Sequence, residues 1–124
     1  DPAWKEAVES DDVVNVTPAL ISRVNEFCIE ERNYSHTEFF TPLAYAIYKG
    51  KLNIAHALLE EKTSDFTVGS HIPELWVKRT PLDWAMRKDH KLIVEILFQL
   101  GAPCKDSAEK DKYVAQRMAR KKSA

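Results

Sequence analysis

Glycine is scarce in this sequence, with only three among 124 residues. A loop that wraps a phosphate needs backbone unhindered by side chains, and no glycine-rich motif of nucleotide-binding proteins is present. The G-x-S-x-G pattern of a hydrolase nucleophile is missing as well. These absences argue against an enzyme and against a nucleotide cofactor.

Histidine is also too scattered to suggest a metal site. The four histidines never occur at H-x-x-x-H or H-E-x-x-H spacing; they are His36, His56, His71 and His90. A metal site needs several ligands to converge, and the sequence gives no reason to expect that. We therefore expect no metal and no cofactor.

Cysteine occurs only twice, as Cys28 and Cys104, which form no C-x-x-C pair. The two residues fit either reduced thiols that pack as small apolar side chains or a disulfide bond. We expect the reduced state, which favours a cytoplasmic or nuclear location.

Long apolar runs are missing too. None approaches the roughly 20 residues that span a bilayer, and no targeting peptide is visible. The net charge of −1 argues against whole-surface attraction to nucleic acid or to an anionic membrane. A composition of 44% hydrophobic and 30% charged residues is typical of one soluble domain. The chain starts with Asp1-Pro2 instead of Met, so we expect an excerpt or a processed product.

What the sequence does contain is an internal repeat. The segment TPLAYA at residues 41–46 returns as TPLDWA at residues 80–85. The spacing is about 39 residues, which is typical of stacked repeat units that bury their apolar faces against one another. Such units form an extended surface rather than a catalytic pocket, so the repeat predicts a binding scaffold.

Each repeat carries the signals for a pair of helices. Thr41 can cap a helix, Pro42 suits its first turn, and Gly50 can end it. A second helix is expected at about residues 53–61. The next unit repeats this order, with its second helix over 91–100.

The two ends of the chain look like weaker copies. Toward the N-terminus, Thr17-Pro18 is expected to start a helix that reaches Phe27. Toward the C-terminus, residues 114–119 match 80–85, which aligns Val114 with the helix-capping Thr80. We therefore expect a single domain over residues 1–124, with units at approximately 2–36, 41–75 and 80–104 and a partial capping unit at 107–122.

These motifs resemble ankyrin repeats. The T-P-L-x-x-A start, the G-K-x-x-I turn and the Leu-Leu or Leu-Phe helix end carry the resemblance, which is specific over residues 41–61 and 80–102 and weak at both ends. It implies an all-α solenoid of stacked helix-turn-helix units with projecting loop or β-hairpin fingers. It also implies a non-catalytic protein–protein interaction module. The expected partner is a protein, and no small-molecule substrate, nucleic acid or membrane insertion is expected.

Two departures from the family pattern stand out. Ala44 and Asp83 replace the histidine that usually follows T-P-L, so the family's Thr–His hydrogen bond is missing, and we expect lower stability without a change of fold. The spacing also exceeds the family's usual period of about 33 residues. The excess falls in the connections at residues 28–40 and 63–79, and the second of these is unusually apolar for a loop.

Partner contacts in the family fall just before T-P-L and in the outer half of the first helix. Carried onto matching positions, the resemblance predicts contacts at Phe40, Tyr48, Lys49, Trp76, Val77, Arg79, Arg87 and Lys88. Aromatic residues and arginine are also the types that dominate interface energetics. For Trp76 and Val77 two interpretations stay open: they cover the helices as a lid, or they lie on a finger and contact the partner.

A basic run near the C-terminus supports an alternative function. It comprises Arg117, Arg120, Lys121 and Lys122. Such a run is typical of a nucleic-acid-associated or regulatory subunit, or of favourable cations near a helix C-terminus on a soluble cap. We favour the cap, because three acidic residues upstream offset much of the positive field.

Overall fold

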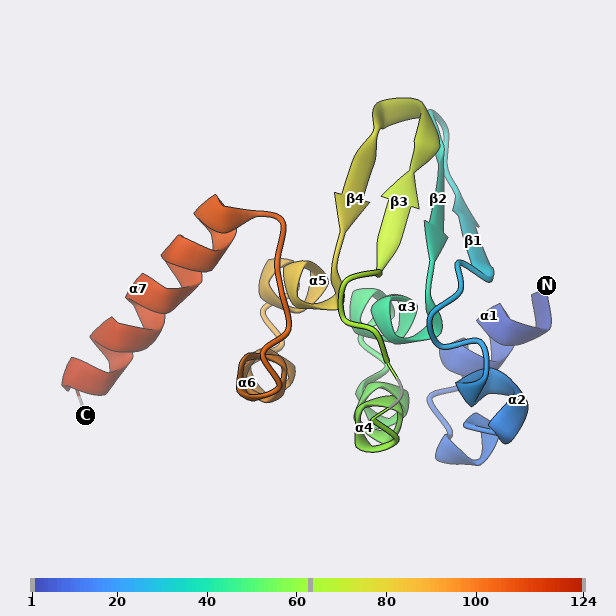
Figure 1. Ribbon diagram of the computed structural model, residues 1–124, viewed down its shortest axis with the longest axis horizontal. Coiled ribbons are helices and arrows are strands. Elements are labelled where there is room, and N and C mark those ends of the chain that lie inside the picture. The colour runs from blue at the N-terminus through green and yellow to red at the C-terminus, as the bar shows by residue number, and fades with distance from the viewer. Residues whose placement is uncertain (1, 63, 124) are drawn as a thin grey trace.

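The computed structural model describes residues 2–62 and 64–123 (Figure 1). Its helices are α1 (Pro2–Glu9), α2 (Pro18–Ile21), α3 (Pro42–Lys49), α4 (Leu52–Glu60), α5 (Pro81–Arg87), α6 (Lys91–Gln99) and α7 (Ser107–Ser123). Its strands are β1 (Ile29–Arg32), β2 (Thr37–Phe40), β3 (Ser70–Ile72) and β4 (Val77–Arg79). Short 3-10 helices, Val13–Asn15 and Pro73–Leu75, lie in two of the connections.

Helices α1 to α6 follow one another across the molecule below the sheet, and α7 lies beyond them at one end (Figure 1). Helix α3 packs against α1, α4 and α5, and α5 packs against α6 and α7. The two predicted helix pairs are therefore present, α3 with α4 and α5 with α6. Their second helices begin and end within one residue of the expected bounds. The division of the chain into units at the bounds given above stays a prediction.

The T-P-L threonines cap their helices as expected. The Thr41 hydroxyl accepts a backbone N–H of the first turn at 3.3 Å, and Gly50 ends α3 in the left-handed region at φ 73°. In the next unit the Thr80 hydroxyl accepts the backbone N–H of Asp83 at 3.2 Å. Asp89 takes the left-handed conformation there, at φ 55°, which aspartate tolerates better than most residues.

The core lies between these helix pairs. Four equivalent leucines of the two units, Leu43, Leu58, Leu82 and Leu97, are each at most 1% exposed. Helix α3 is buried over Pro42–Ile47 because other helices cover it on several sides. Burying a leucine side chain stabilises the fold by roughly 1.5–3 kcal/mol, so these positions hold the helix pairs together.

The predicted hairpin fingers are present in the two long connections, and together they form a small antiparallel sheet, so the domain is mostly helical and not purely α. The strand order of the sheet is β1-β2-β3-β4, two hairpin fingers joined side by side. Phe39 pairs with His71 where β2 meets β3, and His71 pairs with Lys78 where β3 meets β4. Aromatic and β-branched residues in the connections suit a pleated, half-buried surface. The apolar character of the second connection is explained in part by Ile72, which is buried in β3.

The N-terminal copy has a shorter helix than expected. Thr17 does cap it, with its hydroxyl accepting the N–H of Leu20 at 3.2 Å. The helix nevertheless ends at Ile21, and the chain then runs through turns to β1. Phe27 lies in the irregular segment between these turns and β1, and not on the helix.

The C-terminal copy also differs from the expected alignment. Helix α7 begins at Ser107, well before Val114, and is a single helix of 17 residues. Its first turn is capped by the Asp106 carboxylate, which accepts the N–H of Glu109 at 3.0 Å. Residues 107–113, before the aligned segment, contain no glycine or proline, and an alanine, a glutamate and two lysines among them favour a helix. Tyr113 is buried and lies 6.2 Å from Phe98 between ring centroids, which seats α7 against α6.

Asp83 compensates for the missing histidine by a different set of bonds. Its carboxylate accepts the N–H of Thr80 at 2.8 Å, which completes a reciprocal cap at the start of α5. The same carboxylate accepts the backbone N–H groups of Lys105 and Asp106 at 3.1 Å. Asp83 is 1% exposed, and a buried carboxylate is tolerated only with such donors. The expected loss of stability follows from the missing Thr–His bond alone, and the hydrogen bonds to Asp83 oppose it.

Candidate functional site

Six of the eight predicted contact residues lie where one face of the sheet meets α3 and α5, or directly beneath it. Tyr48 and Lys49 end α3, Arg87 ends α5 with Lys88 following it, and Arg79 ends β4 just before α5 begins. Ring contacts with Trp84 and Tyr48 bring them together. We call this surface the inner face and define it as Tyr48, Lys49, Arg79, Trp84, Arg87 and Lys88.

The centre of the inner face is a pair of aromatic rings. Tyr48 meets Trp84 edge to face, with ring centroids 4.8 Å apart. Phe40, the sixth predicted residue, stacks beneath Tyr48 at 4.9 Å and lies 5.7 Å from Trp84. The prediction of Phe40 as a partner contact is wrong, because Phe40 is 0% exposed. Side chains alternate between the two faces of β2, and this places Phe40 in the core, where it supports Tyr48 from below.

Four cations surround these two rings. The Lys88 ammonium lies 4.9 Å from the centre of the Tyr48 ring, and that of Lys49 lies 5.4 Å from it. The guanidinium groups of Arg79 and Arg87 lie 5.2 Å and 5.9 Å from the Trp84 ring. Attraction between a cation and a ring face favours these positions. Long, otherwise mobile side chains are thereby held over a fixed aromatic base.

A buried hydrogen-bond chain fixes Trp84 to the sheet. The indole N–H donates to the Ser70 hydroxyl at 2.8 Å, and that hydroxyl donates to the Glu38 carboxylate at 2.8 Å. Arg79 lies 3.6 Å from the same carboxylate. Sequence reasoning missed Glu38 and Ser70. The period of two that places Phe40 inward also places Glu38 inward, and this signal could have found it.

A second polar cluster lies at the N-terminal side of the inner face. The Tyr45 hydroxyl lies 2.9 Å from Glu31 and 3.2 Å from Glu9, and it donates to one of them at a time. Lys5 and Lys49 also contact Glu31, at 3.3 Å and 3.6 Å. Burial raises the pKa of the Tyr45 hydroxyl, and the neighbouring Glu31 raises it further. Burial also opposes ionisation of Glu31, but Tyr45 and the two lysines outweigh it and lower its pKa.

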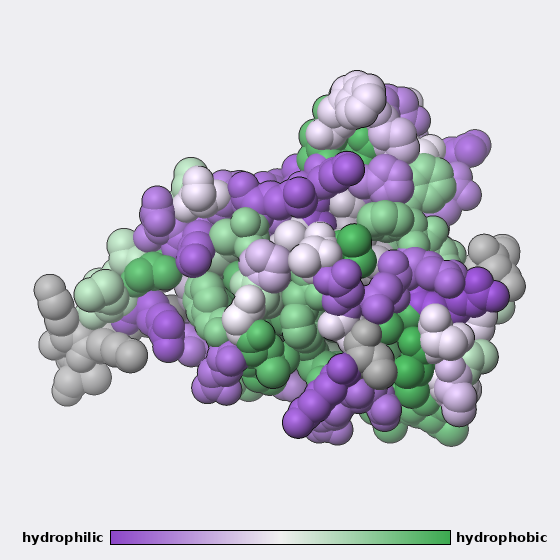
Figure 2. Space-filling model, viewed as in Figure 1, coloured by the Kyte–Doolittle hydropathy of each residue, from purple (hydrophilic) through white to green (hydrophobic). Residues whose placement is uncertain are grey.

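Trp76 and Val77 lie apart from the inner face, at the tip of the β3–β4 finger. This tip projects beyond the rest of the surface in Figure 2. Trp76 is 91% exposed and takes the left-handed conformation at φ 55°. Of the two interpretations left open, Trp76 is therefore not a lid over the helices. Val77 is half-buried at the start of β4, and its role as a contact stays a prediction.

The basic C-terminal run is partly engaged with the fold. Arg117 pairs with Glu95 at 2.7 Å and lies over the Phe98 ring at 5.8 Å, which ties α7 to α6. The side chains of Arg120, Lys121 and Lys122 lie outside the described residues. Arg117 thus serves the packing of α7 rather than an open basic patch.

Other chemistry is not apparent in the described part of the chain. No group of three or more metal-binding side chains comes together there. None of the helices described is both long and apolar enough to cross a bilayer. Cys28 and Cys104 are free thiols. Burial raises the pKa of both, and the charge of Asp83 adds to the effect at Cys104, so neither is an activated nucleophile.

Helix pairs linked by hairpin fingers define a repeat protein that offers a surface. A family model described as ankyrin repeats in three copies matches residues 6–108. No match was found among curated proteins or solved structures. The matched segment covers most of the chain and includes both T-P-L units, so the chain belongs to the ankyrin-repeat family. Members of this family are generally non-catalytic modules of protein–protein interaction.

Proposed function

We propose that this chain is a non-catalytic module, a short solenoid of stacked helix pairs, that binds a partner protein through its inner face and fingers. The observation that carries the proposal is the Tyr48–Trp84 ring pair with four cations around it. Tryptophan, tyrosine and arginine are the residues most often found as binding hot spots. Here Tyr48, Arg79 and Arg87 lie together on one surface, and Trp84, which is 5% exposed, supports them from below.

Rigidity of the inner face supports the same function. The Trp84–Ser70–Glu38 chain and the stacking of Phe40 hold the rings before any partner arrives. Immobilising a flexible side chain on binding costs about 0.5–1.5 kcal/mol. A surface whose anchors are already fixed avoids much of this loss, so more of the contact energy contributes to affinity.

The finger tip supplies a second contact of a different kind. Trp76 and Leu75 are both exposed to water at the tip. Large apolar side chains in the open favour contact with a partner. We therefore propose that the partner extends from the inner face along the β3–β4 finger to its tip.

A capture experiment with matched variants tests the proposal. The unchanged chain, the variants Arg87→Ala/Lys88→Ala and Trp76→Ala, and the control Lys91→Ala are used as bait, and captured proteins are identified by mass spectrometry. Affinity for each captured protein is then measured by calorimetry. We expect the double variant and Trp76→Ala each to weaken binding by about 1–2 kcal/mol or more. Lys91 is exposed on α6, so the control should bind as the unchanged chain does. Equal affinities for all four baits would contradict the proposal.

A salt titration of binding distinguishes a protein-binding module from the alternative, a nucleic-acid-associated subunit. Binding to phosphate groups weakens steeply as the salt concentration rises, because lysine and arginine release the counterions of the nucleic acid. Binding of an oligonucleotide that is lost at high salt and unchanged in Arg87→Ala/Lys88→Ala would favour the alternative. We further propose a reducing compartment, cytoplasmic or nuclear, for a chain with two free thiols.

A further inference from the structure

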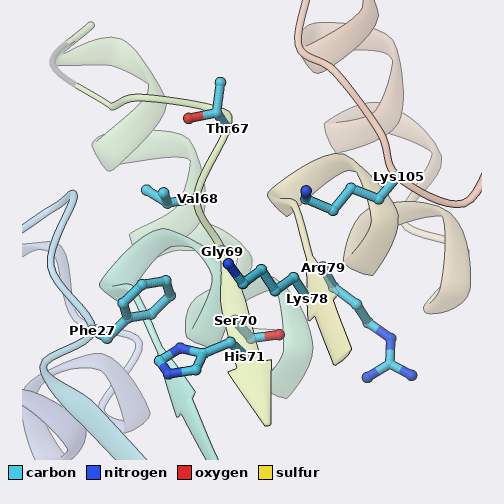
Figure 3. Close-up of a pocket in the computed structure, with 9 residues that line it drawn as sticks. All are labelled: Phe27, Thr67, Val68, Gly69, Ser70, His71, Lys78, Arg79 and Lys105. Atoms are coloured by element: carbon cyan, nitrogen blue, oxygen red, sulfur yellow. The ribbon is translucent and has the colours of Figure 1, made fainter. Parts of the chain in front are cut away.

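The back of the finger sheet carries a pocket that is separate from the inner face. Cross-strand partners lie on the same side of a sheet and alternate residues lie on opposite sides. Ser70 and Arg79 are paired and contact Trp84 on the inner face. His71 and Lys78 are the next pair and therefore face the back. Figure 3 shows the pocket against this side of β3 and β4.

One wall of this back pocket is apolar. Phe27 and Val68 form it, side by side in Figure 3. The edge of the Phe27 ring meets His71 with centroids 4.4 Å apart, and His71 stacks on Phe39 at 5.4 Å. Phe27 is 38% exposed, so an apolar group entering the pocket would cover surface that now meets water.

The opposite side of the back pocket is positively charged. Lys78 and Lys105 reach into it, and no aspartate or glutamate is among its lining residues. Neither ammonium lies within ion-pair distance of a carboxylate in the described part of the chain. Arg79 also borders the pocket, but its guanidinium points away from it in Figure 3, toward the side where Glu38 lies.

Both lysines stand on fixed backbone. Lys78 is the middle residue of β4, and the N–H of Lys105 is held by the buried carboxylate of Asp83 at 3.1 Å. Two ammonium groups without counter-charge, held beside an apolar wall, fit a ligand that has one apolar group and one carboxylate. Charge-assisted hydrogen bonds from lysine to a carboxylate are roughly twice as strong as neutral ones.

The size of the back pocket limits the ligand to about one residue. Its volume is about 250 Å³. An apolar cavity of about 150 Å³ is enough to bind benzene, whereas pockets for drug-sized molecules begin at about 300 Å³. The pocket therefore has room for one ring or branched chain together with a carboxylate.

We propose that the back pocket binds the C-terminal residue of a protein, with its apolar side chain against Phe27 and Val68 and its carboxylate between Lys78 and Lys105. Capture of a terminal carboxylate is a recurring way of recognising a peptide. This site lies on the other side of the sheet from the inner face and does not depend on the function proposed for that face.

A pair of peptides tests the proposal by NMR titration. One is a hexapeptide of glycine and serine that ends in phenylalanine with a free carboxylate, and the other is the same peptide with a terminal amide. We expect the free acid to shift the signals of Val68, His71 and Lys78, and the amide to bind at least about tenfold more weakly. The double variant Lys78→Gln/Lys105→Gln should lose affinity for the free acid by a similar factor. The control Lys91→Gln should lose none.

Several outcomes would overturn the proposal. These are equal binding of the two peptides, shifts confined to Trp84 and Tyr48 on the inner face, or no shift up to about 10 mM peptide. The peptide comparison uses the unchanged chain, so it does not depend on how the variants fold. N-acetylphenylalanine has the same terminal residue and should bind no more tightly than the hexapeptide. If it binds markedly more tightly, a preceding chain is unfavourable at this site, and the assignment to a protein terminus is wrong.

Discussion

The two T-P-L units start alike but connect differently to the segment that comes after each of them. In the unit of α3, the backbone N–H of Thr41 donates to the carbonyl of Gly69 at 2.8 Å, which ties the helix to the next finger. In the unit of α5, the N–H of Thr80 donates to Asp83 instead. That carboxylate also takes the N–H of Lys105, in the segment that leads directly into α7. The side chain that fits after T-P-L thus depends on the segment that follows the helix pair. Alanine is found where a finger follows, and aspartate is found where α7 follows.

The aromatic residue two positions after T-P-L shows a parallel between the same units. Tyr45 and Trp84 are both buried, and each points its polar group at the finger that precedes its helix. The Tyr45 hydroxyl reaches Glu31 of β1, and the Trp84 indole reaches Ser70 of β3. Equivalent positions therefore make the same kind of contact with different chemistry.

The largest expected effect comes from the shared core. Leu58→Ala and Leu97→Ala should each lower the free energy of unfolding by about 2–5 kcal/mol, because both side chains are fully buried and leave a cavity. Urea unfolding measures it. The exposed control Lys91→Ala should change stability by under about 0.5 kcal/mol. Equal effects at leucine and lysine positions would contradict the equivalence of the two units.

The residue after T-P-L, Ala44 or Asp83, is the second position to change. Asp83→Ala should lower the free energy of unfolding by about 2–4 kcal/mol, because the cap is lost and buried N–H groups stay unpaired. Ala44→Asp should destabilise as well, since the N–H of Thr41 is already taken by Gly69 and the new buried carboxylate finds no such donor. Thermal unfolding of both variants checks this. A stabilised Ala44→Asp would show that the position does not depend on the next segment.

Removing the polar group of Trp84 or Tyr45 should weaken the contact between each helix and its finger. Trp84→Phe should destabilise by about 1–3 kcal/mol, because the buried Ser70 hydroxyl loses the indole N–H that donates to it. Tyr45→Phe should have a smaller effect of about 0.5–1.5 kcal/mol, since Glu31 keeps Lys5 and Lys49. Denaturant unfolding ranks the two variants. A larger effect of Tyr45→Phe would show that the contact of Tyr45 with its finger is the stronger of the two.

The smallest effect is a pH dependence at the N-terminal unit. The pKa of Glu31 is lowered in the folded state, against the opposing effect of burial, by Tyr45 and two lysines. Its stabilisation is therefore present above the unfolded pKa of about 4.3 and is lost as the pH falls through the lower, folded value. Glu31→Gln should flatten the stability curve in this acid range and leave the slope near neutral pH unchanged. If stability falls equally steeply with decreasing pH in both proteins, Glu31 does not cause the loss of stability in acid.

The helix pairs could be predicted from sequence because their signals are local. Thr41 and Pro42 mark a helix start side by side in the chain, and the capping and left-handed residues behave as expected. The sheet could not be predicted in the same way. Phe39 and His71 pair across two different connections with two helices between them in the chain, and such short strands carry too little alternation to fix a partner.

The residues of the candidate site could be predicted only where they occupy positions that the repeat defines. Tyr48 and Lys88 do meet on one surface, because the C-terminal ends of α3 and α5, which are equivalent helices of neighbouring units, lie side by side. The prediction of a partner contact at Phe40 was wrong, because a position before T-P-L does not show which side of β2 the side chain faces. Asp83 reads in the sequence as a lost histidine, and its new partners lie beyond the whole of the second helix, at Lys105 and Asp106.

The early start of α7 has a consequence for self-association. With no third hairpin in the described residues, β4 is left as the last strand of the sheet. An unpaired strand edge invites a second molecule to add its own strand and so to begin an aggregate. Here the edge is only three residues long, with Lys78 at its middle. A short, charged edge disfavours polymerisation through β4.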